Sequence, residues 1–143
     1  MKTSGKIEFG DFQTPPSLAS EVCALLHRLG ETPAIVLEPT VGRGAFLLAA
    51  ADAFPQAALR GYDINPGHVA EATEALHAAG AGARATVAVQ DFFTCDWEKE
   101  LATFTGPLLL LGNPPWVTNA GVSVVNGTNL PIKKNFQIGR AHV

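Results

Sequence analysis

Residues 34–46 read AIVLEPTVGRGAF, and this stretch decides the fold class. An apolar run, an acidic residue and two glycines that open a helix are typical of an α/β protein that holds a nucleotide-like ligand at the carboxyl ends of parallel strands. The dinucleotide-binding pattern has a third small residue three places after the second glycine, whereas this chain has Leu47 there. Glu38 would repel a pyrophosphate but attract an ammonium group. We therefore expect a ligand that is cationic at one end.

Two further apolar runs end at side chains that suit the rest of such a ligand. Residues 58–62 lead into Asp63, and an acidic residue about twenty positions past a glycine loop is the usual acceptor for ribose hydroxyls. Residues 85–89 lead into Asp91 and Phe92. Asp91 can accept a hydrogen bond from an adenine amine, and Phe92 can cover the ring.

A fourth apolar run ends in a rigid corner, because residues 108–116 read LLLLGNPPW. Asn113 and Pro114 each precede a proline, which restricts their backbone and holds their acceptor oxygens in fixed directions. With the indole of Trp116 they would form a pocket for a flat amine. The same residues could also simply end a strand and open a turn.

Five segments in order resemble the motifs of a class I, S-adenosylmethionine-dependent DNA adenine-N6 methyltransferase of the gamma arrangement. They are residues 12–16 (FQTPP), 37–44 (LEPTVGRG), 61–65 (GYDIN), 90–93 (QDFF) and 113–116 (NPPW). In that arrangement the Thr-Pro segment comes first, and the Asn-Pro-Pro-aromatic motif follows the cofactor motifs without an intervening recognition domain. The resemblance extends over residues 9–119 and implies an enzyme of the restriction–modification type.

The resemblance implies that S-adenosylmethionine binds along the carboxyl edge of the sheet. The Thr-Pro segment would contact its methionine end, the acidic residue and glycine loop its ammonium and sugar side, and the acid after the second strand its ribose. A carboxylate, an aliphatic and an aromatic side chain would hold its adenine. The implied cofactor-binding residues are Thr14, Pro15, Glu38, Pro39, Gly42, Gly44, Asp63, Ile64, Asp91 and Phe92.

The implied catalytic residues are Asn113, Pro114, Pro115 and Trp116. The Asn113 side chain and the Pro114 carbonyl would accept hydrogen bonds from the exocyclic amine of adenine and stabilise the positive charge that develops as it attacks the sulfonium methyl group. Trp116 would stack on a base flipped out of the DNA duplex, which is worth roughly 1–3 kcal/mol. The reaction needs no metal, and DNA recognition would depend on a region outside this chain.

Other substrates and classes stay open at this point. Similar pockets methylate cytosine amines, adenines of ribosomal RNA and the glutamine amide of release factors, although Trp116 favours a nucleobase. A non-catalytic cofactor-binding fragment is a further alternative. A nicotinamide-dependent dehydrogenase is disfavoured by Leu47 and Glu38.

Composition favours one soluble α/β domain. The chain has 143 residues, of which 47% are hydrophobic, and it contains neither a membrane-length apolar run nor an apolar signal core, so we expect a cytoplasmic protein. Cys23 and Cys95 lack metal-ligand spacing and are interpreted as packing or surface residues. The net charge of −3, with only Lys133 and Lys134 clustered, provides little of the basic surface on which DNA binding normally depends.

Hydrophobic periodicity predicts helices after Pro16 and over 45–53 and 66–79, with strands over 34–37, 58–62, 85–89 and 108–111. In the first helix the apolar face would consist of Leu18, Val22, Leu25, Leu26 and Leu29. The last strand is apolar on both faces, as expected of a parallel strand with helices on each side. Right-handed crossovers would then form a doubly wound, mostly parallel, Rossmann-like methyltransferase sheet.

The family fold has more strands than the four found here, so we expect the sheet to stop after its fourth strand. Residues 1–137 would be the N-terminal part of a methyltransferase domain, inactive by itself. Residues 138–143 read IGRAHV, which one frame of a widely used sequencing adapter would also encode. We therefore expect this tail to be non-native.

Overall fold

The computed structural model describes residues 13–114, in which helices and strands alternate. The elements in order are α1 (Pro16–Arg28), β1 (Ile35–Glu38), α2 (Ala45–Ala53), β2 (Ala58–Asp63), α3 (Pro66–Ala78), the 3-10 turn η2 (Gly82–Arg84), β3 (Ala85–Val89), α4 (Trp97–Leu101) and β4 (Leu108–Leu110). The predicted helices and strands are confirmed to within a residue or two at their ends. Helix α4 was not predicted from the sequence.

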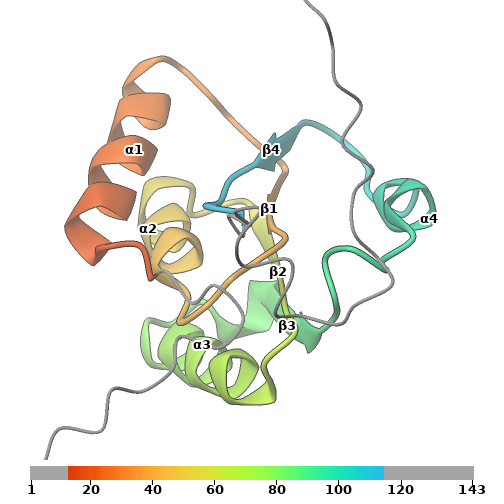
Figure 1. Ribbon diagram of the computed structural model, residues 1–143. Coiled ribbons are helices and arrows are strands. Elements are labelled where there is room, and N and C mark those ends of the chain that lie inside the picture. Colours follow the sequence, from red (N-terminus) through yellow and green to blue (C-terminus); the bar gives the residue numbers. More distant parts are fainter. Residues whose placement is uncertain (1–12, 115–143) are drawn as a thin grey trace, which may run out of the picture.

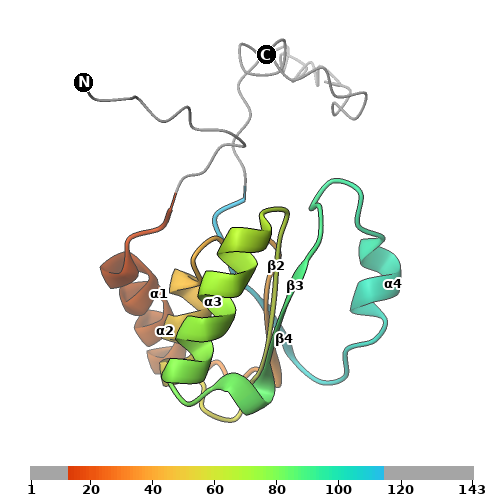
Figure 2. The same cartoon turned by 90° about the horizontal axis from the view of Figure 1, so that it is seen from below.

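The four strands form one parallel sheet in the order β3-β2-β1-β4. The chain moves outward from β1 to β2 and β3, and then returns through α4 to place β4 on the other side of β1. Helices α1, α2 and α3 lie on one face of the sheet and α4 lies on the opposite face (Figures 1 and 2). The predicted doubly wound α/β fold is therefore confirmed. Its direction of winding reverses between β1 and β4, where such folds bind ligands.

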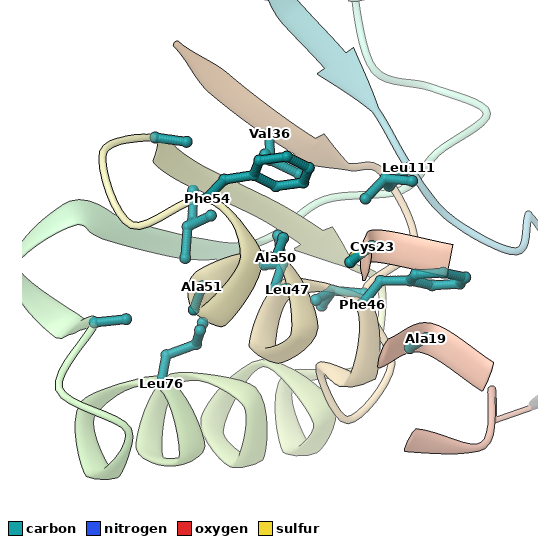
Figure 3. Close-up of a cluster of buried hydrophobic side chains, with 14 of the residues drawn as sticks. Ala19, Cys23, Val36, Phe46, Leu47, Ala50, Ala51, Phe54, Leu76 and Leu111 are labelled. Atoms are coloured by element: carbon teal, nitrogen blue, oxygen red, sulfur yellow. The ribbon is translucent and has the colours of Figure 1, made fainter. Parts of the chain in front are cut away.

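The hydrophobic core lies between the sheet and the three helices α1 to α3 (Figure 3). Its largest fully buried members include Leu47 of α2, Leu59 of β2 and Leu76 of α3. Cys23 of α1 is also in this core, and burial raises the pKa of its thiol to about 11. Cys23 is thus a packing residue, as the sequence indicated.

The predicted apolar face of α1 is wrong in part. Leu18, Leu25 and Leu29 are exposed, and the buried residues of the helix are Ala19 and Cys23. Helix α1 packs against α2, which is itself rich in alanine. Small side chains allow the two backbones to approach closely, so the side of α1 that carries small residues faces inward and some of its leucines face outward.

The prediction that helices cover both faces of the last strand is also wrong for the described residues. Leu110 of β4 is 63% exposed and Leu108 is 39% exposed. Strand β4 lies at one edge of the described sheet, and α4, the helix on that face, is only five residues long. The outward-facing leucines of β4 therefore remain accessible.

Candidate functional site

The polar residues predicted from the sequence gather at one edge of the sheet. Glu38 ends β1, Asp63 ends β2, Asp91 follows β3 and Asn113 follows β4. Because the strands are parallel, these four positions lie along the same edge. The segments that lead into α1 and out of β4 lie on this side as well (Figure 2).

Asp63 joins the glycine loop to the loop after β2. One carboxylate oxygen accepts a hydrogen bond from the backbone N–H of Gly42 at 2.8 Å, and the other accepts from the N–H of Asn65 at 2.8 Å. The imidazole of His68 lies 3.6 Å from the second oxygen. A carboxylate has about four lone-pair sites, so Asp63 can hold both loops and still accept from a ligand hydroxyl.

The glycine loop needs both of its glycines. Gly42 has φ of 52° and Gly44 has φ of 93°, which are left-handed conformations that residues with a Cβ rarely adopt. A Cβ on Gly42 would also lie 2.6 Å from Oε1 of Gln13. That oxygen accepts a hydrogen bond from the N–H of Arg43 at 3.1 Å. Gln13, which precedes α1, therefore contacts the glycine loop, and Thr14 and Pro15 follow Gln13 directly in the sequence.

Glu38 is the one charged residue that is buried in the described part of the chain, with 3% of its surface exposed. Burial raises the pKa of its carboxyl group well above the ordinary value, the hydrogen bond from the N–H of Leu47 lowers it, and the negative charge of Asp63 raises it further. That hydrogen bond measures 3.2 Å. A cationic ligand group beside Glu38 and Asp63 would favour the ionised carboxylate.

The structure explains why Leu47 occupies a position that is small in dinucleotide-binding proteins. Leu47 packs onto Gly61 of β2, and a Cβ on Gly61 would lie 2.7 Å from Cδ1 of Leu47. The small residue that allows close contact between α2 and the sheet is thus on the strand instead of the helix.

An aromatic group follows β3. The Asp91 carboxylate accepts a hydrogen bond from the N–H of Phe93 at 2.9 Å and so stabilises the turn. The Phe92 ring lies 5.7 Å from the ring of Trp97, whose indole N–H donates to the Phe92 carbonyl at 2.9 Å. Trp97 is the first residue of α4, and these two contacts hold Phe92 in place. Ile64, expected on the other face of an adenine ring, is 46% exposed.

The corner after β4 lies directly against the end of β1. The N–H of Leu111 donates to the carbonyl of Leu37 at 3.0 Å, and the hydroxyl of Thr40 donates to the backbone carbonyl of Asn113 at 3.3 Å. The structure thus brings Asn113 and Pro114 next to the segment that carries Glu38. Pro115, Trp116 and the tail over 138–143 lie outside the described residues.

Gln13, Thr40 and Trp97 are residues of this edge to which the sequence assigned no role. Trp97 is visible in the sequence as an aromatic residue, but nothing in the sequence pairs it with Phe92. Within residues 13–114, no group of three or more histidine, cysteine, aspartate or glutamate side chains is placed to hold a metal ion. The same residues include no helix with the length and apolar character needed to cross a membrane.

Comparison with known proteins identifies the relatives of this chain. It is 40% identical to the type II methyltransferase M.NspV of a Nostoc species over 133 residues, which is 92% of the chain. The chain is a homologue of type II methyltransferases. A second such methyltransferase, M.XamI of Xanthomonas campestris pv. amaranthicola, is 34% identical over 108 residues, or 76% of the chain. No protein-family model matches.

This methyltransferase homologue spans 28% of the length of M.NspV and 20% of the length of M.XamI. Among solved structures, its fold is similar to that of an O-methyltransferase of Bacillus cereus in complex with SAH, with a TM-score of 0.57. The two are 13% identical, and the match covers 70% of this chain and 46% of the other. The predicted Rossmann-like methyltransferase fold is confirmed.

Proposed function

We propose that the chain binds S-adenosylmethionine at the carboxyl ends of its strands, and that the whole protein transfers the methyl group to the exocyclic amine of adenine in DNA. The observation that supports this most is the arrangement of Glu38, Asp63 and Asn113 along one edge of the sheet. Glu38 and Asp63 both accept hydrogen bonds from the segment that forms the glycine loop and opens α2, and the Asn113 backbone is held against the same segment.

The cofactor would lie across this edge. Its ammonium group would face Glu38, because a buried carboxyl with a second carboxylate nearby is stabilised by a cation. Its ribose hydroxyls would donate to Asp63, which is already fixed by two backbone N–H groups. Its adenine would lie between Ile64 and Phe92, with Asp91 accepting from the amine. The Bacillus cereus structure, with its bound SAH, supports the choice of cofactor through its similar fold.

The Asn113–Pro114 corner would hold the accepting amine. When bound, S-adenosylmethionine would supply a methyl carbon on a positively charged sulfur. The amine nitrogen would form a bond to that carbon as the carbon–sulfur bond breaks, S-adenosylhomocysteine would leave, and the methylated nitrogen would release a proton to water. The side-chain oxygen of Asn113 and the carbonyl of Pro114 would each accept a hydrogen bond from the amine. These bonds strengthen as positive charge develops on the nitrogen, so they lower the barrier more than they improve substrate binding.

The choice of adenine in DNA depends on the order of the motifs, whereas the relatives support the coarser statement that the protein is a methyltransferase of type II. DNA recognition would depend on residues that these relatives have beyond the matched region, so the chain by itself would bind the cofactor without completing the transfer. Trp116 would stack on the flipped base.

Cofactor binding is tested on the chain itself by calorimetry with S-adenosylmethionine and S-adenosylhomocysteine. Asp63→Ala should weaken binding, whereas Asn113→Ala should leave it largely intact and abolish transfer in the natural-length protein. Asp52→Ala, which removes an exposed acid of α2, is the matched control and should bind as the wild type does. Equal loss of binding in the Asp63 and Asn113 variants would contradict these roles.

The substrate is tested by expressing the natural-length gene in a methylation-free host and mapping modified bases by single-molecule sequencing. We expect N6-methyladenine at a specific DNA sequence. Methylated release factor together with unmodified DNA would overturn the choice of substrate. If calorimetry detects no heat of binding with S-adenosylmethionine and none with S-adenosylhomocysteine, the choice of cofactor would be overturned.

A further inference from the structure

We propose that Thr40 is a positioning residue that holds the Asn113–Pro114 corner in place for methyl transfer. This inference rests on the proposed function, because it assigns the corner to the amine substrate. Thr40 lies in the segment that leads into the glycine loop, and its hydroxyl bonds to the corner that follows β4.

The corner is attached to the end of β1 at three successive positions. Leu111 donates its N–H to the carbonyl of Leu37 at 3.0 Å. Gly112 has φ of 154°, and a Cβ there would lie 3.6 Å from Cγ of Glu38, so its backbone passes close to that side chain. The half-buried Thr40 then donates its hydroxyl to the Asn113 carbonyl at 3.3 Å. The first two contacts follow from strand pairing and packing, and the third requires a hydroxyl side chain.

A single hydrogen bond at this carbonyl restrains both acceptors of the corner. The carbonyl of Asn113 and the nitrogen of Pro114 belong to the same planar peptide group. The proline ring fixes φ of Pro114, and Pro115 in the sequence restricts its ψ to extended values. Anchoring the Asn113 carbonyl therefore restricts the direction of the Pro114 carbonyl as well, and it sets the point from which the Asn113 side chain leaves the backbone.

The same short segment would then control both halves of the reaction. Glu38 contacts the start of α2 through the N–H of Leu47, and Thr40 contacts the corner two residues later. With the cofactor ammonium beside Glu38, the distance between the methyl group and the amine would depend on the Thr40 hydrogen bond. Catalytic rates are sensitive to such positioning, and displacement of about 1 Å can cost roughly a hundredfold.

The test compares Thr40→Val, which keeps the shape of the side chain and loses the hydroxyl, with Thr40→Ser, which keeps the hydroxyl. In the natural-length protein, Thr40→Val should lower kcat for methyl transfer roughly tenfold, the scale of one lost hydrogen bond, and leave KM for S-adenosylmethionine unchanged. Thr40→Ser should restore most of kcat. Thr73→Val is the matched control, because its hydroxyl donates to the Val69 carbonyl within α3 at 2.7 Å, and its kcat should stay at the wild-type value.

Hydrogen exchange of the backbone N–H of Asn113 provides a second measurement that does not depend on activity. We expect faster exchange in Thr40→Val than in wild type and Thr40→Ser. An unchanged kcat in Thr40→Val would overturn the role of Thr40, even if the variant lost thermal stability and cofactor affinity. A wild-type protein that transfers no methyl group to adenine would overturn the proposed function. The role of Thr40 has its own test, because equal exchange rates at Asn113 in wild type and Thr40→Val would contradict it whether or not methyl transfer is observed.

Discussion

Replacing Gly61 with alanine should destabilise the protein through one steric contact. The new Cβ would lie 2.7 Å from Cδ1 of Leu47 and 3.1 Å from Cγ2 of Val41, whereas carbon atoms in contact are normally about 3.5–4.0 Å apart. Leu47 is fully buried, so its side chain has no free space into which it can move. Overpacking of this kind typically costs about 1–3 kcal/mol, and we expect the free energy of unfolding to fall by that amount.

The assay is urea denaturation of a double-mutant cycle with Leu47→Ala. Leu47→Ala alone should cost about 2–5 kcal/mol, because it leaves a cavity in the core. In the double variant the Cβ introduced at position 61 would occupy part of that cavity, so the two losses should sum to more than the loss of the double variant by about 0.5–3 kcal/mol. Strictly additive losses, or a Gly61→Ala loss below about 0.5 kcal/mol, would refute the assignment of Gly61 as the small residue that Leu47 requires.

Two further variants test buried or partly buried charge. Because burial raises the pKa of Glu38 in the folded protein, the native state holds a proton that the unfolded state releases, and stability should fall as pH rises from the ordinary carboxyl value of 4.5 to the raised folded value. Glu38→Gln should remove this fall in stability, so the variant should be more stable than wild type at neutral pH. It should also bind S-adenosylmethionine more weakly. Melting temperatures that decline equally with pH in both proteins would contradict the role of the buried carboxyl group. Arg84 donates hydrogen bonds to three carbonyls at and after the end of α2, those of Ala51 at 2.7 Å, Ala57 at 2.8 Å and Phe54 at 3.2 Å. Arg84→Met should therefore lower the free energy of unfolding by about 2–3 kcal/mol in urea, with partial recovery in Arg84→Lys, and full recovery by lysine would show that charge alone is sufficient.

Features that depend on neighbouring residues were predictable from the sequence. The apolar runs over 85–89 and 108–111, the glycines at positions 42 and 44, and the carboxylates after the strands indicated a parallel sheet with its site at the carboxyl edge. Helix α4 was missed because five residues are too few to show a helical period. The face of α1 was partly wrong because periodicity locates leucines but does not reveal that Ala19 and Cys23 are the residues of α1 that are buried in the core.

The sequence by itself determined the kind of site, because the carboxylates, the glycine loop and the proline-restricted corner are each written within a few consecutive residues. Only the tertiary structure decided how these parts support one another. Thr40 and Asn113 are 73 positions apart, and Gln13 and Arg43 are 30 apart. Parallel strands require crossover connections, so residues that meet at the sheet edge are necessarily distant along the chain, and a local pattern cannot show which of them will bond.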